Sequence, residues 1–296
     1  MGLRGGAVAS SSRQTTIGNM WPIIGTEAIA SGALTRGQLR WNYTALHPNV
    51  YVAKNHERTV MTNAYAAWLW TRRTGIVAGR AAAAMHGVSL IDDSTPIEMI
   101  ANHGRQPPGI VIRKERIEDD EVQTLGPLRV TTPARTALDL GRRLPRNAAV
   151  PLLDALSRTT GVDYAEVAAL MDRYRGARRI PQARAALPLM DGGTRSPAET
   201  RLRLMFHDAG MPTPRTSILL DDGRDVAVVG MGWDSHKVGV SFQEPGGADR
   251  YRLVQEIMHQ EVLQRLGWVE IRVAALNQPR SILHRVRDAL RRSRLT

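Results

Sequence analysis

Apolar residues recur at two spacings along the chain, and the changes between these spacings divide most of it into blocks. Short helical pieces and then an alternating pair of strands are expected over residues 21–57. Residues 58–140 begin with a helical pattern and continue with strand-like runs. Residues 141–190 carry apolar positions three to four apart, as in LLDALSRTT and YAEVAALMDRYRGARRI, which predicts mostly helix.

The glycine-containing stretch PLMDGGTRSP, at 188–197, reads as a linker into the last block. That block, 198–296, opens with a helix and continues with two strand-like runs near residues 216–242. A long helix is expected at 249–266, a strand at 268–274, and a terminal helix after them.

The segment GTEAIASGALTRGQLRWN has the pattern of a helix-turn-helix. TEAIAS predicts a short helix, and Gly32 can end it. Thr35 then begins a second helix, with Gln38 at the spacing of a capping box. Leu34 before this cap and Leu39 after it have the spacing of a hydrophobic staple.

The next segment, YTALHPNVYVAK, predicts a β-hairpin that turns at His-Pro-Asn. A hairpin after a recognition helix is a wing, so residues 21–57 are expected to form a winged helix-turn-helix. Leu39 and Trp41 would hold the second helix to its domain. Side chains of types that contact base edges or phosphates are expected to face DNA. They are Thr35, Arg36, Gln38, Arg40 and Asn42 in the helix and His47, Asn49 and Lys54 in the wing. The alternative interpretation is a small helical cap whose arginines are only solvated.

Charge favours a polyanionic partner. The 296 residues include 40 basic and 28 acidic side chains, for a net charge of +12. Only three of the basic residues, Lys54, Lys114 and Lys237, are lysines, so 37 are arginines. Arginine suits phosphate and guanine, although the codon bias of a GC-rich genome also explains the ratio of arginine to lysine.

Several classes of protein are disfavoured by what the sequence lacks. No cysteine is present, which excludes disulfides and zinc fingers and fits a reducing compartment. No apolar run approaches the roughly eighteen residues of a membrane span, and the first 20 residues lack the apolar core of a secretory signal. We therefore expect a cytoplasmic protein without membrane contact. Its scattered histidines, and the absence of phosphate-loop and GxSxG motifs, predict no catalytic residue, metal or cofactor.

ALTRGQLRW followed by HPNVYVAK resembles the N-terminal winged helix of AbiEi-type antitoxins, with PNVY in the place of a "GVY"-like wing. The likeness continues through AAWLW at 66–70, AGRAAAAMHGV at 78–88 and VTTPARTALDLGRR at 130–143, and it is similar to actinobacterial, especially mycobacterial, members. The resemblance implies an antitoxin of a type IV toxin–antitoxin system. Such a protein represses its own operon by binding promoter repeats in double-stranded DNA and counteracts a nucleotidyltransferase-like toxin.

The string TTPARTALD also has a physical interpretation. Thr132 or Thr131 would cap a helix with Pro133 at its first position. Arg135 and Asp139 are four residues apart and could form an ion pair, which we interpret as structural. His86, at the end of an alanine-rich helix, is expected to cap that helix and not to bind a metal.

SPAETRLRLMFHDAGMPTP, a strand pair and EVLQRLGWVEIRV resemble the very-short-patch-repair-like branch of the PD-(D/E)xK endonuclease fold. In that family, carboxylates hold a divalent cation that activates water. Here Gly230 occupies the aspartate position, Ser241 and Gln243 replace the following carboxylates, and Gly247 falls near the histidine position. Magnesium needs several hard oxygen ligands, so the resemblance implies a nuclease-like scaffold without catalysis.

Some features of this scaffold remain. Glu199 and Glu256 are kept, and Asp225, Asp234 and Glu244 could form a migrated metal site. The expected core residues are Leu202, Leu204, Met205, Leu263, Leu266 and Trp268. The alternatives to an antitoxin and autorepressor are therefore a metal-dependent DNA endonuclease targeted by a winged helix and an architectural DNA-binding protein.

These patterns predict a multidomain chain of the α+β or α/β class. A flexible tail at 1–20 would precede the winged helix-turn-helix at 21–57. A mixed α/β and helical region would follow at 58–190, and a degenerate restriction-endonuclease-like α/β domain at 191–296.

Overall fold

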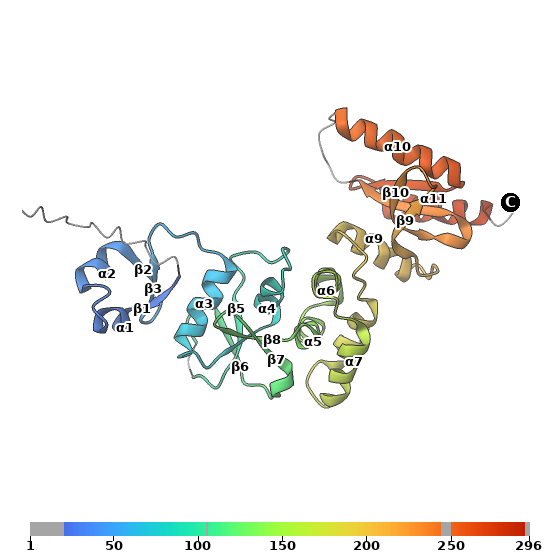
Figure 1. Ribbon diagram of the computed structural model, residues 1–296. Coiled ribbons are helices and arrows are strands. Elements are labelled where there is room, and N and C mark those ends of the chain that lie inside the picture. Colours follow the sequence, from blue (N-terminus) through green and yellow to red (C-terminus); the bar gives the residue numbers. More distant parts are fainter. Residues whose placement is uncertain (1–20, 105, 244–249, 294–296) are drawn as a thin grey trace, which may run out of the picture.

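The computed structural model describes residues 21–104, 106–243 and 250–293, and in this part of the chain three β-sheets follow one another (Figure 1). A layer of helices lies between the second sheet and the third. The expected tail at 1–20 is outside the described residues. The chain is thus a mixed α/β protein with several sheets, as the sequence predicts.

The N-terminal unit combines two short helices with a three-stranded antiparallel sheet in the order β1-β3-β2. Its elements are β1 (Ile23–Ile24), α1 (Gly25–Ala30), α2 (Arg36–Asn42), β2 (Tyr43–His47) and β3 (Val50–Ala53). This sheet packs on α3 (Val60–Trp70), where Val50 joins the core of the next unit. Arg73 donates to both carboxylate oxygens of Glu27, over 2.8 and 2.6 Å, and so joins the two units.

The middle region is built on a mixed five-stranded sheet in the order β6-β5-β4-β8-β7. Its elements after α3 are β4 (Ile76–Ala78), α4 (Gly79–Met85), β5 (Ile97–Ile100), β6 (Ile110–Arg113), the 3-10 turn η1 (Asp119–Glu121), β7 (Val122–Leu125) and β8 (Leu128–Thr131). The central strand β4 pairs antiparallel with β5 and parallel with β8. Val77 and Met99 on these strands are fully buried because α3 and α4 pack against them.

A helical layer follows the sheet. It consists of α5 (Pro133–Arg143), α6 (Arg146–Thr160), α7 (Tyr164–Arg173), α8 (Ile180–Ala186) and the 3-10 turn η2 (Leu187–Leu189). The predicted start of α5 is confirmed, since the side chain of Thr132 accepts a hydrogen bond from the backbone of Arg135 and Pro133 takes the first position. His86 is the C-cap residue of α4, as predicted, and its ring contacts the carbonyl of Thr131 at 2.8 Å.

The helix expected through YAEVAALMDRYRGARRI is interrupted in the structure. α7 ends at Arg173, and α8 begins only after Arg179, whose φ of 64° lies in the left-handed region. Gly176 falls in the intervening turn, where its low helix propensity disfavours continuation. The apolar spacing predicted the helical face correctly but not this break.

The predicted pair of Arg135 and Asp139 is present, with 3.4 Å between its nitrogen and oxygen, and it belongs to a larger buried network. Arg135 also contacts Glu115 at 3.2 Å and pairs with Glu121. Arg135 is completely buried, so its charge needs these carboxylates to replace lost hydration. The network joins α5 to the turn η1 and supports a structural role for this motif.

The C-terminal domain has a four-stranded sheet in the order β12-β11-β10-β9. Its elements are α9 (Pro197–Asp208), β9 (Arg215–Asp221), β10 (Val226–Trp233), the 3-10 turn η3 (Asp234–His236), β11 (Val238–Gln243), α10 (Arg250–Leu266), β12 (Val269–Ala274) and α11 (Pro279–Arg292). β11 and β12 are parallel and are joined through α10. The predicted core residues Leu202, Leu204 and Leu263 are buried, and Met205, Leu266 and Trp268 are partly buried.

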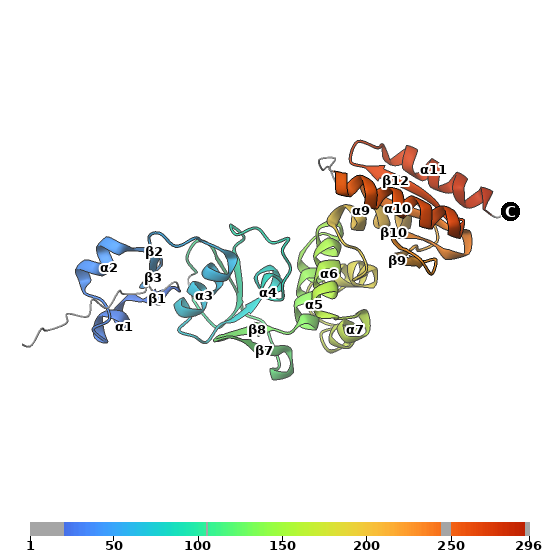
Figure 2. The ribbon, with the colours of Figure 1, turned by 45° about the horizontal axis from the view of Figure 1, so that its top comes forward.

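The predicted linker at 188–197 is held between the helical layer and the C-terminal domain. Figure 2 shows α9 between α6 and the C-terminal sheet. Asp154 of α6 accepts hydrogen bonds from the backbone of Asp191 and from the hydroxyls of Thr194 and Thr200, at 2.7 to 2.8 Å. Arg203 of α9 pairs with the same carboxylate at 2.8 Å.

Candidate nucleic-acid interface

The start of α2 is organised by the capping box that the sequence predicts. The Thr35 hydroxyl accepts from the Gln38 backbone N–H at 3.1 Å, and the Gln38 side-chain oxygen accepts from the Thr35 N–H at 2.8 Å. These side-chain atoms accept hydrogen bonds from two backbone N–H groups at the start of the helix that would otherwise have no partner within it. Thr35 and Gln38 are exposed, but this bonding makes them positioning residues for the helix.

Leu39 alone anchors α2 from its inner face, and the expected anchoring role of Trp41 is wrong. Leu39 is 8% exposed, whereas Trp41 is 72% exposed. Residues two apart on a helix point in different directions, so a helix of seven residues cannot bury both on one side. A Cβ at Gly25 would lie 3.1 Å from Leu39 and 2.6 Å from Tyr51, so only glycine allows α1 to approach this closely.

The outer face of α2 carries free positive charge. Arg36 and Arg40 are exposed, and neither forms an ion pair with a residue in the described part of the chain. The Arg40 guanidinium lies 5.9 Å from the centroid of the exposed Trp41 ring. Asn42 and Lys54 are also exposed, and the Lys54 N–H donates to the Asn42 carbonyl at 2.9 Å. These five exposed residues, four on α2 and Lys54 bonded to its last residue, form the surface that we call the α2 face.

The hairpin turn places Asn49 in a structural role. Its φ is 62°, a left-handed conformation that asparagine tolerates. The Asn49 side-chain oxygen accepts from the Thr26 N–H at 3.0 Å, and its amide donates to the Thr26 hydroxyl at 2.8 Å. Asn49 therefore fastens the turn to the first residues of α1.

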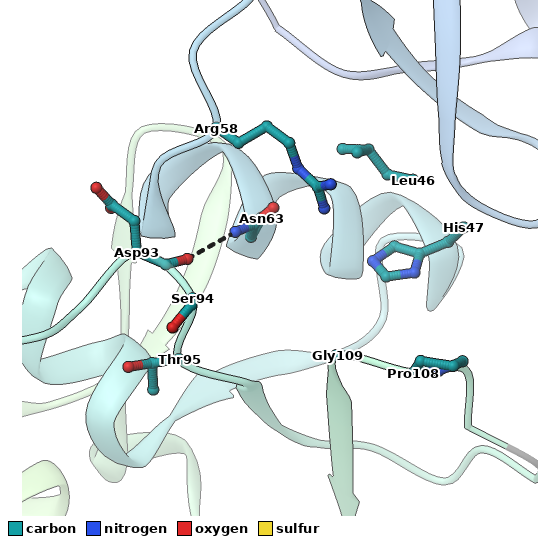
Figure 3. A pocket seen from close by; sticks show the side chains of 9 residues that line it. All are labelled: Leu46, His47, Arg58, Asn63, Asp93, Ser94, Thr95, Pro108 and Gly109. Carbon is teal, nitrogen blue, oxygen red and sulfur yellow. Dashed lines mark hydrogen bonds between the residues drawn. The ribbon is translucent and has the colours of Figure 1, made fainter.

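His47 points away from the outer face of the hairpin and into a cavity of about 410 Å³ (Figure 3). Arg58, Asn63 and Asp93 are among the other residues that line this cavity. Burial and the charge of Arg58 lower the pKa of His47 to about 4. The imidazole is therefore neutral at neutral pH and faces the cavity. The expectation that His47 contacts DNA from the wing does not fit this position.

In the C-terminal domain, the structure assembles the positions that the nuclease resemblance singles out. The Gly230 N–H donates to the Ser241 hydroxyl at 3.1 Å, and a Cβ at Gly230 would lie 3.1 Å from a Glu199 oxygen. Ser241 also bonds Glu270 of β12 at 2.5 Å, and His259 of α10 lies 3.2 Å from the same carboxylate. We call these five residues the nuclease-like centre. Sequence reasoning missed Glu270, a lone carboxylate within the apolar run WVEIRV.

Cations contact two of the carboxylates at or near this centre, Glu270 and Glu256. The hydrogen bond to Glu270 raises the pKa of His259. Arg272 contacts Glu270 at 3.2 Å and also pairs with Glu256. Across residues 21–104, 106–243 and 250–293, no three histidine, aspartate or glutamate side chains are grouped to hold a metal ion.

The migrated metal site is not assembled from the residues that can be placed. Asp225 precedes and Asp234 follows the eight-residue strand β10, so they lie at opposite ends, about 30 Å apart. Asp225 pairs with Arg265 at 3.0 Å, and Asp234 pairs with Arg215 at 2.8 Å. Glu244 and Gly247 lie outside the described residues.

Comparison with known proteins gives distant relatives. No protein-family model matches the chain. A protein of Mycobacterium tuberculosis strain CDC 1551, named only as uncharacterized, is 25% identical over 219 residues, covering 72% of this chain and 80% of the relative. An uncharacterized protein of strain H37Rv has the same identity and coverage. Within the described residues, no helix has the length and apolar character needed to span a bilayer.

Proposed function

We propose that residues 21–57 form a winged helix-turn-helix and that α2 enters the major groove of double-stranded DNA. The observation that carries the proposal is the α2 face. Arg36 and Arg40 are exposed and have no ion-pair partner among the residues described, on a helix whose start is held by a capping box. They are four residues apart and so share one side of the helix, where guanidinium groups can reach guanine edges and phosphates.

The order of the elements supports this proposal. The β2–β3 hairpin follows α2 directly, and β1 completes its sheet. In winged helix-turn-helix proteins, a hairpin in this position lies beside the DNA backbone. Lys54, exposed just beyond the hairpin, can then contact phosphate, while Asn42 and Trp41 extend the surface at the end of α2.

For the whole chain, we propose an antitoxin and transcriptional autorepressor that acts in the cytoplasm. It would bind repeats in its own promoter and counteract a nucleotidyltransferase-like toxin. The support is the likeness of ALTRGQLRW, HPNVYVAK and VTTPARTALDLGRR to AbiEi-type antitoxins, together with the exposed arginines of α2. The C-terminal domain would serve as a non-catalytic binding scaffold, because glycine and serine stand where the nuclease resemblance expects carboxylates.

The test of DNA binding is the variant Arg36→Ala with Arg40→Ala, titrated against a duplex of the gene's own promoter at fixed salt. We expect affinity to fall about tenfold or more, since removing a charged group from a base edge costs about 1–3 kcal/mol. The matched control is Arg129→Ala with Arg184→Ala, which removes two exposed arginines from other elements. Circular dichroism checks that both variants remain folded.

A salt series separates specific contacts from diffuse charge. Wild-type affinity is expected to fall steeply with salt, and the α2 variant should show a slope smaller by about one for each phosphate that it no longer neutralises. Unchanged affinity in the α2 variant would move the DNA surface elsewhere. Equal weakening in the control would show that net charge alone accounts for the binding.

A further inference from the structure

A strongly basic pocket lies in the middle region, away from α2. It has a volume of about 550 Å³ and is bordered by the end of β6, the last turn of α5 and the loop between α7 and α8. Its cationic lining consists of Arg113, Lys114, Arg142, Arg143, Arg178 and Arg179. Glu115 is the one acidic residue of the lining. In Figure 1, α3 and the five-stranded sheet separate α5 from α2.

Two arginines of this pocket, Arg113 and Arg143, have buried side-chain nitrogens without a hydrogen-bond partner in the described structure. The side chain of Arg113 is only 9% exposed, and one of its nitrogens pairs with Glu98. Its Nε and Nη1 are buried with no hydrogen-bond partner in the described structure, and the same holds for Nε of Arg143. Buried donors are nearly always bonded in proteins, so these groups indicate a missing acceptor.

The surrounding carboxylates are each shared by more than one cation. Glu115 pairs with Arg142 at 3.2 Å and also with Arg143, in addition to its contact with Arg135. Glu98, behind Arg113, is shared with Arg80 at 3.1 Å. The acids therefore leave the pocket with an excess of positive charge.

This excess of positive charge helps to lower the pKa values of two pocket arginines, because neighbouring cations repel one another. Burial and the charges of Arg143, Arg142 and Arg80 together lower the pKa of Arg113 to about 9, against the opposing effect of Asp139. Burial and the charge of Arg179 likewise lower the pKa of Arg143. A bound anion would reverse this repulsion.

The rim of the pocket is a shaped loop. Arg179 has a φ of 64°, which is uncommon for a residue with a side chain and is found often at ligand sites. The Arg142 Nε donates to the Arg178 carbonyl at 3.1 Å and ties this loop to α5. The loop thereby contributes two exposed arginines, Arg178 and Arg179, to the lining of the pocket.

We propose that this pocket binds a compact anion with two or more phosphate groups, such as pyrophosphate or the triphosphate of a nucleotide. Its volume lies within the range of about 300–1,000 Å³ that is usual for small-molecule sites. Arginine forks match phosphate oxygens in two-point contact. Because Arg113 and Arg142 are recessed, the phosphate has to enter the pocket, which a compact ligand can do and the backbone of a rigid duplex cannot.

The test is calorimetric titration of the full chain with pyrophosphate and, separately, with ATP. The variant is Arg178→Gln with Arg179→Asn, since asparagine tolerates the left-handed conformation at 179. The matched control is Arg175→Gln, which removes an exposed charge from the same loop outside the pocket lining. Thermal melts without ligand establish that the three proteins are equally folded.

We expect saturable one-to-one binding that weakens about tenfold or more in the pocket variant, because two charged donors are removed, and stays within about twofold in the control. Similar affinities for pyrophosphate and ATP would assign the recognition to the phosphates, and tighter ATP binding would add a nucleoside subsite; both support the pocket. Absence of saturable binding, an equal loss in Arg175→Gln, or full retention in the pocket variant would overturn the proposal. Displacement of ATP by duplex DNA would overturn it too, in favour of a nucleic-acid site.

Discussion

His47 and Asn49 lie at the same hairpin turn, yet their side chains have opposite environments. Asn49 bonds Thr26 at the surface, whereas His47 enters the cavity beside Arg58. The pairing of β2 with β3 shifts register between Ala45 and His47. A shift of this kind re-aims a side chain, so strict alternation along the strand predicts the wrong side for His47.

The lowered pKa of His47 predicts a specific loss of stability in acid. The group titrates near 6.5 when unfolded and at about 4 when folded. Its contribution is therefore fully present above about pH 6.5 and is lost as pH falls toward 4, by about 3 kcal/mol at most. Urea unfolding at about pH 7.5 and about pH 4.5 should show a smaller acid loss in His47→Gln than in wild type. Equal losses would contradict the buried, neutral imidazole.

At the scale of elements, the packing of α9 on α6 depends on a buried ion pair. Asp154 is 1% exposed and Arg203 is 5% exposed. Burial raises the pKa of Asp154, and the charge and hydrogen bonds of Arg203 oppose that effect. Such a pair adds little net stability but is costly to break on one side only.

We expect Arg203→Met to destabilise the protein by about 3 kcal/mol, because it leaves the Asp154 carboxylate buried without a counter-ion. Arg201→Met is the matched control, since Arg201 is exposed on the same helix, and its effect should be within about 0.5 kcal/mol. Adding Asp154→Asn to Arg203→Met should recover part of the loss. Denaturant unfolding measures the stability of all three variants. If adding Asp154→Asn recovers no stability, the loss in Arg203→Met does not come from the unpaired Asp154 carboxylate.

At the scale of the whole molecule, the net charge of +12 overstates the positive charge that a partner can reach. Arg135 and Arg203 are buried and paired with carboxylates, so they cannot contact a partner. The α2 face and the basic pocket are two places where positive charge remains available to a partner. Net charge alone therefore favours a polyanionic partner without locating its site.

Catalytic silence is expected for the intact chain. Purified protein should not nick supercoiled plasmid with magnesium or manganese, because Gly230 and Ser241 cannot supply anionic ligands and Glu270 is engaged by His259 and Arg272. An active metal-dependent DNA endonuclease is the positive control. Metal-dependent nicking that disappears in Glu199→Ala or Glu270→Ala would show that the centre is catalytic after all.

The sequence by itself determined those features that depend on neighbouring residues within about one helical turn. The caps at Thr35 and Thr132 and the hairpin after α2 were predicted correctly, because capping and periodicity act over three or four residues. The exposed arginines of α2 were predicted for the same reason. Their function as a DNA-reading surface stays a prediction. The two strand-like runs expected near residues 216–242 are instead three strands, β9, β10 and β11.

Only the tertiary structure decided which charged groups meet. Glu270 bonds Ser241 across 29 residues of sequence, and Arg142 reaches Glu115 across 27. The basic pocket likewise draws its arginines from β6, α5 and the loop before α8. No local pattern encodes these pairs, because they arise from strand pairing and helix packing that bring distant segments together. Burial then sets which charges are neutralised and which remain available to bind.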